Sequence, residues 1–179
     1  MILSVAQRWG GGPSPRSGDG GGILRVENGS SMTHPIALAT LVTGTLDILF
    51  AFLVAGSVAP VLRTVASGAL GDAIADGPAG APLGLLVHFA IMAVMAAAWF
   101  LAAWRLALLR RQWIVAGLLY GVALWLVMYW IVMPLRWASF TAPSEPEAIA
   151  RQLFAHCVLV GLPIAWFAAR HFQVRPSSD

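Results

Sequence analysis

The sequence has no lysine, a single cysteine and few charged residues of either sign. All eleven basic residues of the 179-residue chain are arginines, eight residues are acidic, and charged residues make up 11% of the total. The lone Cys157 excludes an intramolecular disulfide. With 59% hydrophobic residues and a mean hydropathy of +0.77, the composition lies far outside that of soluble globular domains. Lipid is therefore the expected solvent.

Sequence motifs of the common enzyme classes are also missing. No serine stands in a Gly-x-Ser-x-Gly elbow, no His-Glu-x-x-His pair is present, and no glycine-rich phosphate loop occurs. The arginines stand at the ends of apolar runs rather than in a patch, so we do not expect nucleic-acid binding. We predict a protein without enzymatic activity.

Long uncharged runs dominate the rest of the chain. Residues 77–104, 112–135 and 152–169 are uncharged, and a fourth run, 35–62, is broken only by Asp47. Each approaches or exceeds the roughly 18 to 20 residues that a helix needs to cross hydrocarbon. No alternation of polar and apolar residues suggests a barrel, so the spans are helices. We predict an all-α integral membrane protein, a four-helix bundle with spans at 35–58, 83–106, 112–135 and 147–171.

The connections between the predicted spans differ in character. Residues 60–70 form an apolar stripe too short to span, which predicts a short helix in the membrane interface or against the bundle. Residues 71–82 read as an exposed loop. Pro134 is expected to end the third helix and Pro163 to bend the fourth. Ser144 and Glu147 have the spacing of a capping box, which predicts Ser144 as the cap of helix four.

The two ends of the chain differ in composition from the predicted spans. Residues 1–34 are rich in glycine and serine, and we expect a disordered tail or a misassigned start, with Met32 as the native first residue. Residues 173–179 read as a short polar tail. The folded domain is therefore expected to cover residues 35–172.

The distribution of arginines predicts the orientation in the membrane. The turn between spans two and three and the carboxyl-terminal tail are rich in arginine: Arg105, Arg110, Arg111, Arg170 and Arg175. The opposite side carries Arg63, Arg136 and Arg151, diluted by four acidic residues. By the positive-inside rule both termini are cytoplasmic, and we expect a multi-pass protein of the inner membrane.

Asp47 stands midway along the first predicted span. Placing an aspartate near the bilayer centre costs on the order of 3 kcal/mol, which some other interaction has to offset. One interpretation is a carboxylate that carries a proton or coordinates a cation. The other is a protonated side chain that fixes the packing through a hydrogen bond to His88 or to a tyrosine such as Tyr120.

His88 and His156 stand at similar depths in the second and fourth spans. We estimate a depth of about 8 to 9 Å for each, at 1.5 Å of helix rise per residue. Two facing imidazoles suit a protonatable relay with Asp47, a metal pair, or haem b held between axial histidines. Histidines that only hydrogen-bond across helices are the alternative.

The third span carries a helix-packing motif of small residues. Gly117 and Gly121 present a surface on which a neighbouring backbone approaches closely. We interpret it as packing within one chain, with a homo-oligomer or a partner in a membrane complex as the alternatives.

Several short motifs from the second to the fourth span resemble the YagU-like family of small bacterial inner-membrane proteins. The shared pattern comprises His88-Phe89, Gly117-Leu118-Leu119-Tyr120-Gly121, Met133-Pro134-Leu135 and Leu153-Phe154-Ala155-His156. The resemblance implies a four-helix inner-membrane fold without assigned chemistry. Our leading hypothesis is a bundle whose polar interior residues organise packing or handle protons or a small solute. A b-type haem protein and a structural accessory subunit are the alternatives.

Overall fold

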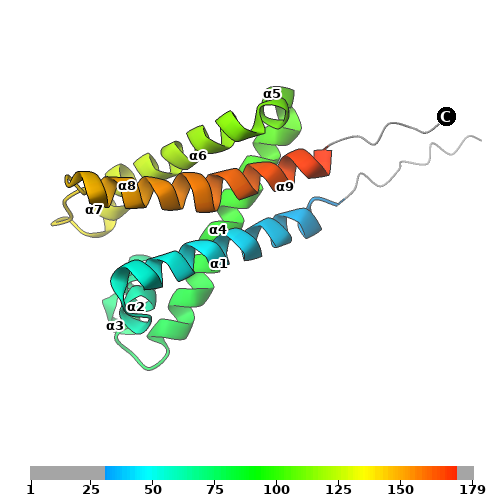
Figure 1. The fold of residues 1–179 in the computed structure, drawn as a ribbon. Helices are drawn as coiled ribbons and strands as arrows, with labels where there is room; N and C mark the ends of the chain where they lie inside the picture. Colours follow the sequence, from blue (N-terminus) through cyan, green and yellow to red (C-terminus); the bar gives the residue numbers. More distant parts are fainter. Residues whose placement is uncertain (1–30, 173–179) are drawn as a thin grey trace, which may run out of the picture. The chain divides into compact units, whose positions relative to one another are not determined.

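The computed structural model describes residues 31–172, which consist of helices and short connections (Figure 1). Within them four helical stretches are long and apolar enough to cross a membrane: Thr33–Ala55, Gly80–Arg105, Trp113–Arg136 and Pro146–Phe172. The predicted all-α fold with four candidate membrane spans is confirmed. Residues 1–30 and 173–179 of the predicted tails lie outside the described range, and Thr33 and His34 belong to the first helix.

The first two spans are single helices, whereas the third and fourth each combine two α-helical parts with a π-helical one. Span one is α1 (Thr33–Ala55) and span two is α4 (Gly80–Arg105). Span three comprises α6 (Trp113–Val127), η1 (Met128–Val132) and α7 (Met133–Arg136). Span four comprises α8 (Pro146–Phe154), η2 (Ala155–Gly161) and α9 (Leu162–Phe172).

Each π-helical segment ends two residues before a proline. Proline lacks the N–H that the carbonyl four residues earlier would accept, and a π-helical turn shifts the pairing to the fifth residue. The N–H of Met133 accordingly donates to the carbonyl of Met128, and that of Leu162 to the carbonyl of Cys157. Pro134 was predicted to end the helix at Leu135, whereas the helix widens ahead of the proline and ends one residue later, at Arg136.

The connections between the spans contain three short helices. Ala59–Leu70 forms α2, the short helix predicted over 60–70, and it packs along α4, whereas Asp72–Ala75 forms α3 within the predicted loop. Ala107–Arg111 forms α5 in the turn between spans two and three. Helix four is capped by Glu145 without a side-chain bond, so Ser144 is not its cap. Pro146 at the first helical position places the helix start one residue later than the capping box predicted.

The buried core lies where α1, α4 and α9 meet. Its largest fully buried side chains are Phe100, Ile164, Val160 and Thr43. Ile48 of α1 is buried as well, because α1 packs against α4 and also against η2 and α9.

Glycines allow the closest helix contacts inside the chain. A Cβ atom on Gly121 would lie 2.4 Å from Cα of Cys157, and one on Gly117 would lie 2.8 Å from Cβ of Ala165. The small-residue surface of span three therefore faces span four of the same chain. Gly84 allows a similarly close contact between α4 and α2, because a Cβ atom added to it would lie 1.9 Å from the carbonyl oxygen of Leu62.

Candidate functional site

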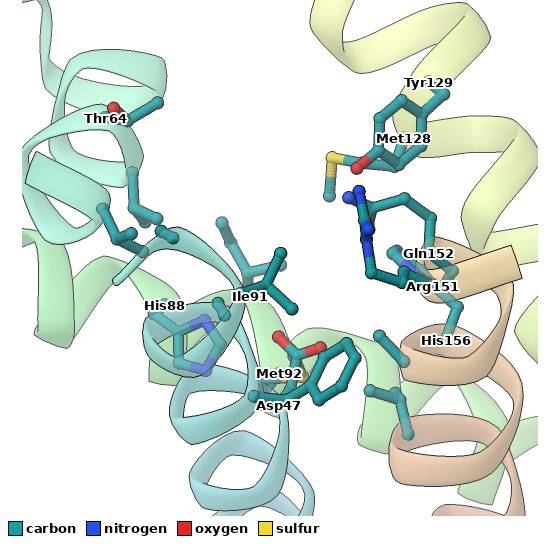
Figure 2. A pocket seen from close by; sticks show the side chains of 18 of the residues that line it. Asp47, Thr64, His88, Ile91, Met92, Met128, Tyr129, Arg151, Gln152 and His156 are labelled. Carbon is teal, nitrogen blue, oxygen red and sulfur yellow. Dashed lines mark hydrogen bonds between the residues drawn. The ribbon is translucent and has the colours of Figure 1, made fainter. Parts of the chain in front are cut away.

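A cavity of about 440 Å³ lies between α1, α2, α4, η1 and the α8–η2 stretch (Figure 2). The structure places Asp47, His88 and His156 together in its lining, although they come from three different spans. Its other polar residues are Thr64, Tyr129, Arg151 and Gln152, and the rest of the wall is apolar.

Asp47 is the only acidic residue in the cavity lining among the residues that the structure describes. Its side chain is half-buried, and Figure 2 shows the carboxylate between His88 on one side and the α8–η2 residues on the other. Both imidazoles line the same cavity as this carboxylate. Within residues 31–172 the carboxylate has no hydrogen bond or ion pair. The side chain is therefore available to a proton or a bound cation.

His88 is buried and oriented by the backbone of α1. Its side chain is 6% exposed, and its Nε2 atom donates a hydrogen bond of 2.9 Å to the carbonyl oxygen of Gly44. The hydrogen bond to Asp47 that a packing role predicted is therefore not formed. The donor of the imidazole is already engaged, which leaves Nδ1 as a hydrogen-bond acceptor.

His156 is oriented by its own helix. It lies in η2, and its Nδ1 atom donates a 2.9 Å hydrogen bond to the carbonyl oxygen of Gln152. Its Nε2 atom is left as an acceptor. The ring stands edge-on to Tyr129 of η1, with 6.2 Å between the ring centroids. Each π-helical segment therefore contributes one ring to the cavity wall.

Sequence reasoning missed two of the lining residues, Tyr129 and Arg151. Tyr129 is carried by η1, and the signal for it was Pro134, because prolines favour π-helical turns that often occur at functional sites. Arg151 was assigned to the outer surface from its charge alone. It is exposed and forms an ion pair with Glu147, one turn earlier on α8.

Tyr120, predicted to be part of the polar interior, lies outside this cavity lining. Its hydroxyl donates a 2.8 Å hydrogen bond to the carbonyl oxygen of Met95, and its ring lies 4.7 Å from that of Trp99 between centroids. Because the side chain of Met95 lines the cavity, Tyr120 supports that wall from outside.

The geometry limits which groups are available to a metal or haem. Among residues 31–172 no cluster of three or more His, Cys, Asp or Glu residues is placed to hold a metal ion. The two imidazoles retain Nδ1 of His88 and Nε2 of His156 as free nitrogens. Haem ligation by this pair stays a prediction.

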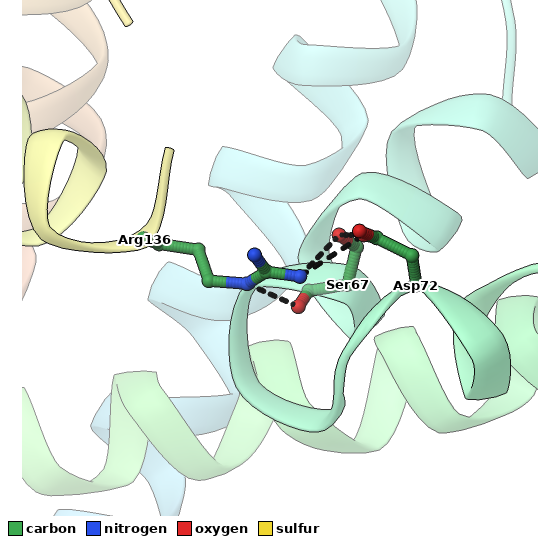
Figure 3. Close-up of polar contacts among 3 residues, drawn as sticks. All are labelled: Ser67, Asp72 and Arg136. Carbon is green, nitrogen blue, oxygen red and sulfur yellow. Dashed lines mark hydrogen bonds and ion pairs between the residues drawn. The ribbon is translucent and has the colours of Figure 1, made fainter. Parts of the chain in front are cut away.

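A polar cluster fixes α2, which forms one wall of the cavity, to the end of span three (Figure 3). Arg136 donates through Nε to the carbonyl oxygen of Ser67 at 2.9 Å and through Nη2 to Oδ1 of Asp72 at 3.0 Å. The hydroxyl of Ser67 also donates to Asp72. The hydrogen bond from Ser67 and the charge of Arg136 hold the pKa of Asp72 below its ordinary value.

Comparison with protein-family models, curated proteins and solved structures finds no match for the sequence. The resemblance to the YagU-like family stays a prediction.

Proposed function

We propose that the chain is a non-enzymatic bacterial inner-membrane protein in which Asp47 exchanges protons, with the cavity as the site of exchange. The observation that supports this most is that the carboxylate of Asp47 faces a cavity of about 440 Å³ without a protein partner among the described residues. A carboxylate retained only for packing would be expected to have such a partner.

The surroundings of Asp47 suit proton transfer. A neutral imidazole can accept a proton at its unprotonated nitrogen and return it from the same nitrogen. His88 and His156 each keep one such acceptor nitrogen, and both line the same cavity as Asp47. The hydroxyl of Tyr129 and the amide of Gln152 add polar groups to the same cavity.

The arginine distribution supports an orientation in which both termini are cytoplasmic. The cavity lining includes Ala55 at the end of α1 and Arg151 and Gln152 in the second half of α8, toward the loops that this orientation makes non-cytoplasmic. In this orientation Asp47 would take up protons from that side through the cavity and pass them on across the membrane.

The test is proton flux into proteoliposomes that contain the full chain and an internal pH-sensitive dye. We expect an imposed pH difference to collapse several-fold faster with wild-type protein than with Asp47→Asn, because the amide cannot carry the proton. Asp76→Asn is the matched control, since it removes an exposed carboxylate outside the cavity lining. Equal flux in wild type and Asp47→Asn would contradict the proposal and favour a packing role.

A further inference from the structure

We infer that the cavity also binds an organic cation, a compact amine or quaternary ammonium with an apolar body, whose charge is placed next to Asp47. The inference rests on the proposed function, because it makes the same carboxylate the site of both proton and solute.

The charges of the cavity favour a cation over an anion. Asp47 is one of two charged residues in the lining, and it has no ion-pair partner within residues 31–172. The other, Arg151, is exposed and forms an ion pair with Glu147. A ligand in the cavity therefore meets an unpaired negative charge.

The two imidazoles of the lining also favour a ligand that donates hydrogen bonds. His88 and His156 both use their N–H groups on backbone carbonyls, so each offers only an acceptor nitrogen to the ligand. A primary or secondary ammonium supplies the N–H donors that match them. A quaternary ammonium has none and would rely on Asp47 and on aromatic faces.

The remaining wall suits an apolar ligand body with an adjacent cationic centre. It contains aromatic and thioether side chains: Phe50, Met92, Met95, Met128 and Tyr129. Aromatic faces attract cations, and methionine adapts to ligands of varied shape. A proton alone would make no contact with these side chains, whereas the body of an organic cation would.

The size of the cavity fits a small molecule. Ligand sites typically occupy about 300–1,000 Å³, are mostly apolar, and form between the helices of bundles. At about 440 Å³ this cavity lies in the lower part of that range. The ligand is thus of the size of a single-ring amine rather than of a lipid.

The test is titration calorimetry of the detergent-purified full chain with benzyltrimethylammonium, with benzylamine as a second cation and benzenesulfonate as the anionic counterpart. We expect saturable binding of both cations and at least tenfold weaker binding of benzenesulfonate. Benzenesulfonate binding as tight as that of the cations would overturn the inference. This comparison uses only wild-type protein, so it holds even where a variant does not fold.

Variants then test whether the charge of Asp47 is recognised. We expect Asp47→Asn to weaken binding of the cations at least tenfold, Asp47→Glu to bind more tightly than Asp47→Asn, and Asp76→Asn to match wild type. Unchanged affinity in Asp47→Asn, or equal losses in both Asp47 variants, would overturn the inference.

Different experiments contradict the proposed proton exchange and the inferred cation binding. Proton flux is measured in vesicles without any organic cation present. If the flux depends on Asp47 but neither cation binds, the cation inference is wrong and the proposed function stands. If the flux does not depend on Asp47, the proposed function is wrong.

Discussion

The Nε2 atom of His88 on α4 donates a 2.9 Å hydrogen bond to the carbonyl oxygen of Gly44, three residues before Asp47 on α1. This contact joins spans one and two beside the cavity and engages the N–H of the imidazole with backbone. His88 therefore borders the cavity without taking up the carboxylate of Asp47. The N–H of His88 therefore has a structural role, whereas the carboxylate of Asp47 has no hydrogen-bond partner within residues 31–172.

Replacing His88 should destabilise the contact between spans one and two. His88→Phe keeps a ring of similar size but removes the donor, and the loss of one hydrogen bond costs about 1 kcal/mol in the free energy of unfolding. His156→Phe should cost less, because that bond lies within one helix and does not join two spans. Unfolding in mixed detergent measures both variants, and equal losses would contradict this account.

The packing of span three on span four predicts a graded response to alanine. Gly121→Ala places a methyl group 2.4 Å from Cα of Cys157, where backbone has to move, and overpacking of this kind costs roughly 1–3 kcal/mol. Gly117→Ala meets the side chain of Ala165 at 2.8 Å and the carbonyl oxygen of Gly161 at 3.0 Å, so it should cost less.

Gly68→Ala in α2 is the control for this series. Its Cβ would lie 3.3 Å from the edge of the Trp137 ring, and alanine favours helix over glycine. We expect unchanged or slightly increased thermal stability in detergent. A loss in Gly68→Ala as large as that in Gly121→Ala would contradict the packing explanation.

The cluster of Ser67, Asp72 and Arg136 predicts a dependence of stability on pH. Because the pKa of Asp72 is lowered in the folded protein, its ionised form stabilises the fold above the unfolded-state pKa of about 3.9. That contribution is lost as the pH falls through the lower folded-state pKa. The midpoint of thermal unfolding measured over this acid range should therefore fall less in Asp72→Asn than in wild type. If the unfolding midpoints of wild type and Asp72→Asn fall in parallel with pH, the ionised form of Asp72 contributes no stability.

Pro163 offers a way to test the π-helical segment of span four. Pro163→Ala restores an N–H for the carbonyl of Leu159, which favours regular α-helix over 155–161 and turns His156 away from its place beside Tyr129. We expect a folded protein with several-fold slower Asp47-dependent proton flux.

Pro146→Ala is the matched control for Pro163→Ala. Pro146 occupies the first turn of α8, where its missing N–H deprives no carbonyl of a partner. Its flux should equal that of wild type. Equal flux in both proline variants would contradict a role for the π-helical segment.

The spans and the polar residues of the cavity follow largely from sequence. Uncharged runs of sufficient length predict the four helices because burying backbone in lipid leaves few alternatives. Asp47, His88 and His156 stood out because ionisable residues at membrane depth are costly. Estimating depth from helix ends placed both histidines at one level, and the structure places them in one cavity.

The sequence could not predict features that depend on geometry between helices. A proline can end a helix, bend it or induce a π-helical turn, and the sequence does not distinguish these outcomes. Only the packed structure shows the π-helical turns that carry Tyr129 and His156. The contact of Arg136 with Ser67 joins residues 69 positions apart. The choice of Gly44 rather than Asp47 as the partner of His88 likewise depends on how α1 is rotated against α4.

The most direct measurement is infrared spectroscopy of the full chain in liposomes during a pH titration, with wild type compared to Asp47→Asn. The account predicts that subtracting the Asp47→Asn titration from the wild-type titration leaves a carboxylic-acid C=O absorption that appears and disappears with pH, and that Asp76→Asn retains this component. Identical titrations in wild type and Asp47→Asn would contradict proton exchange at Asp47.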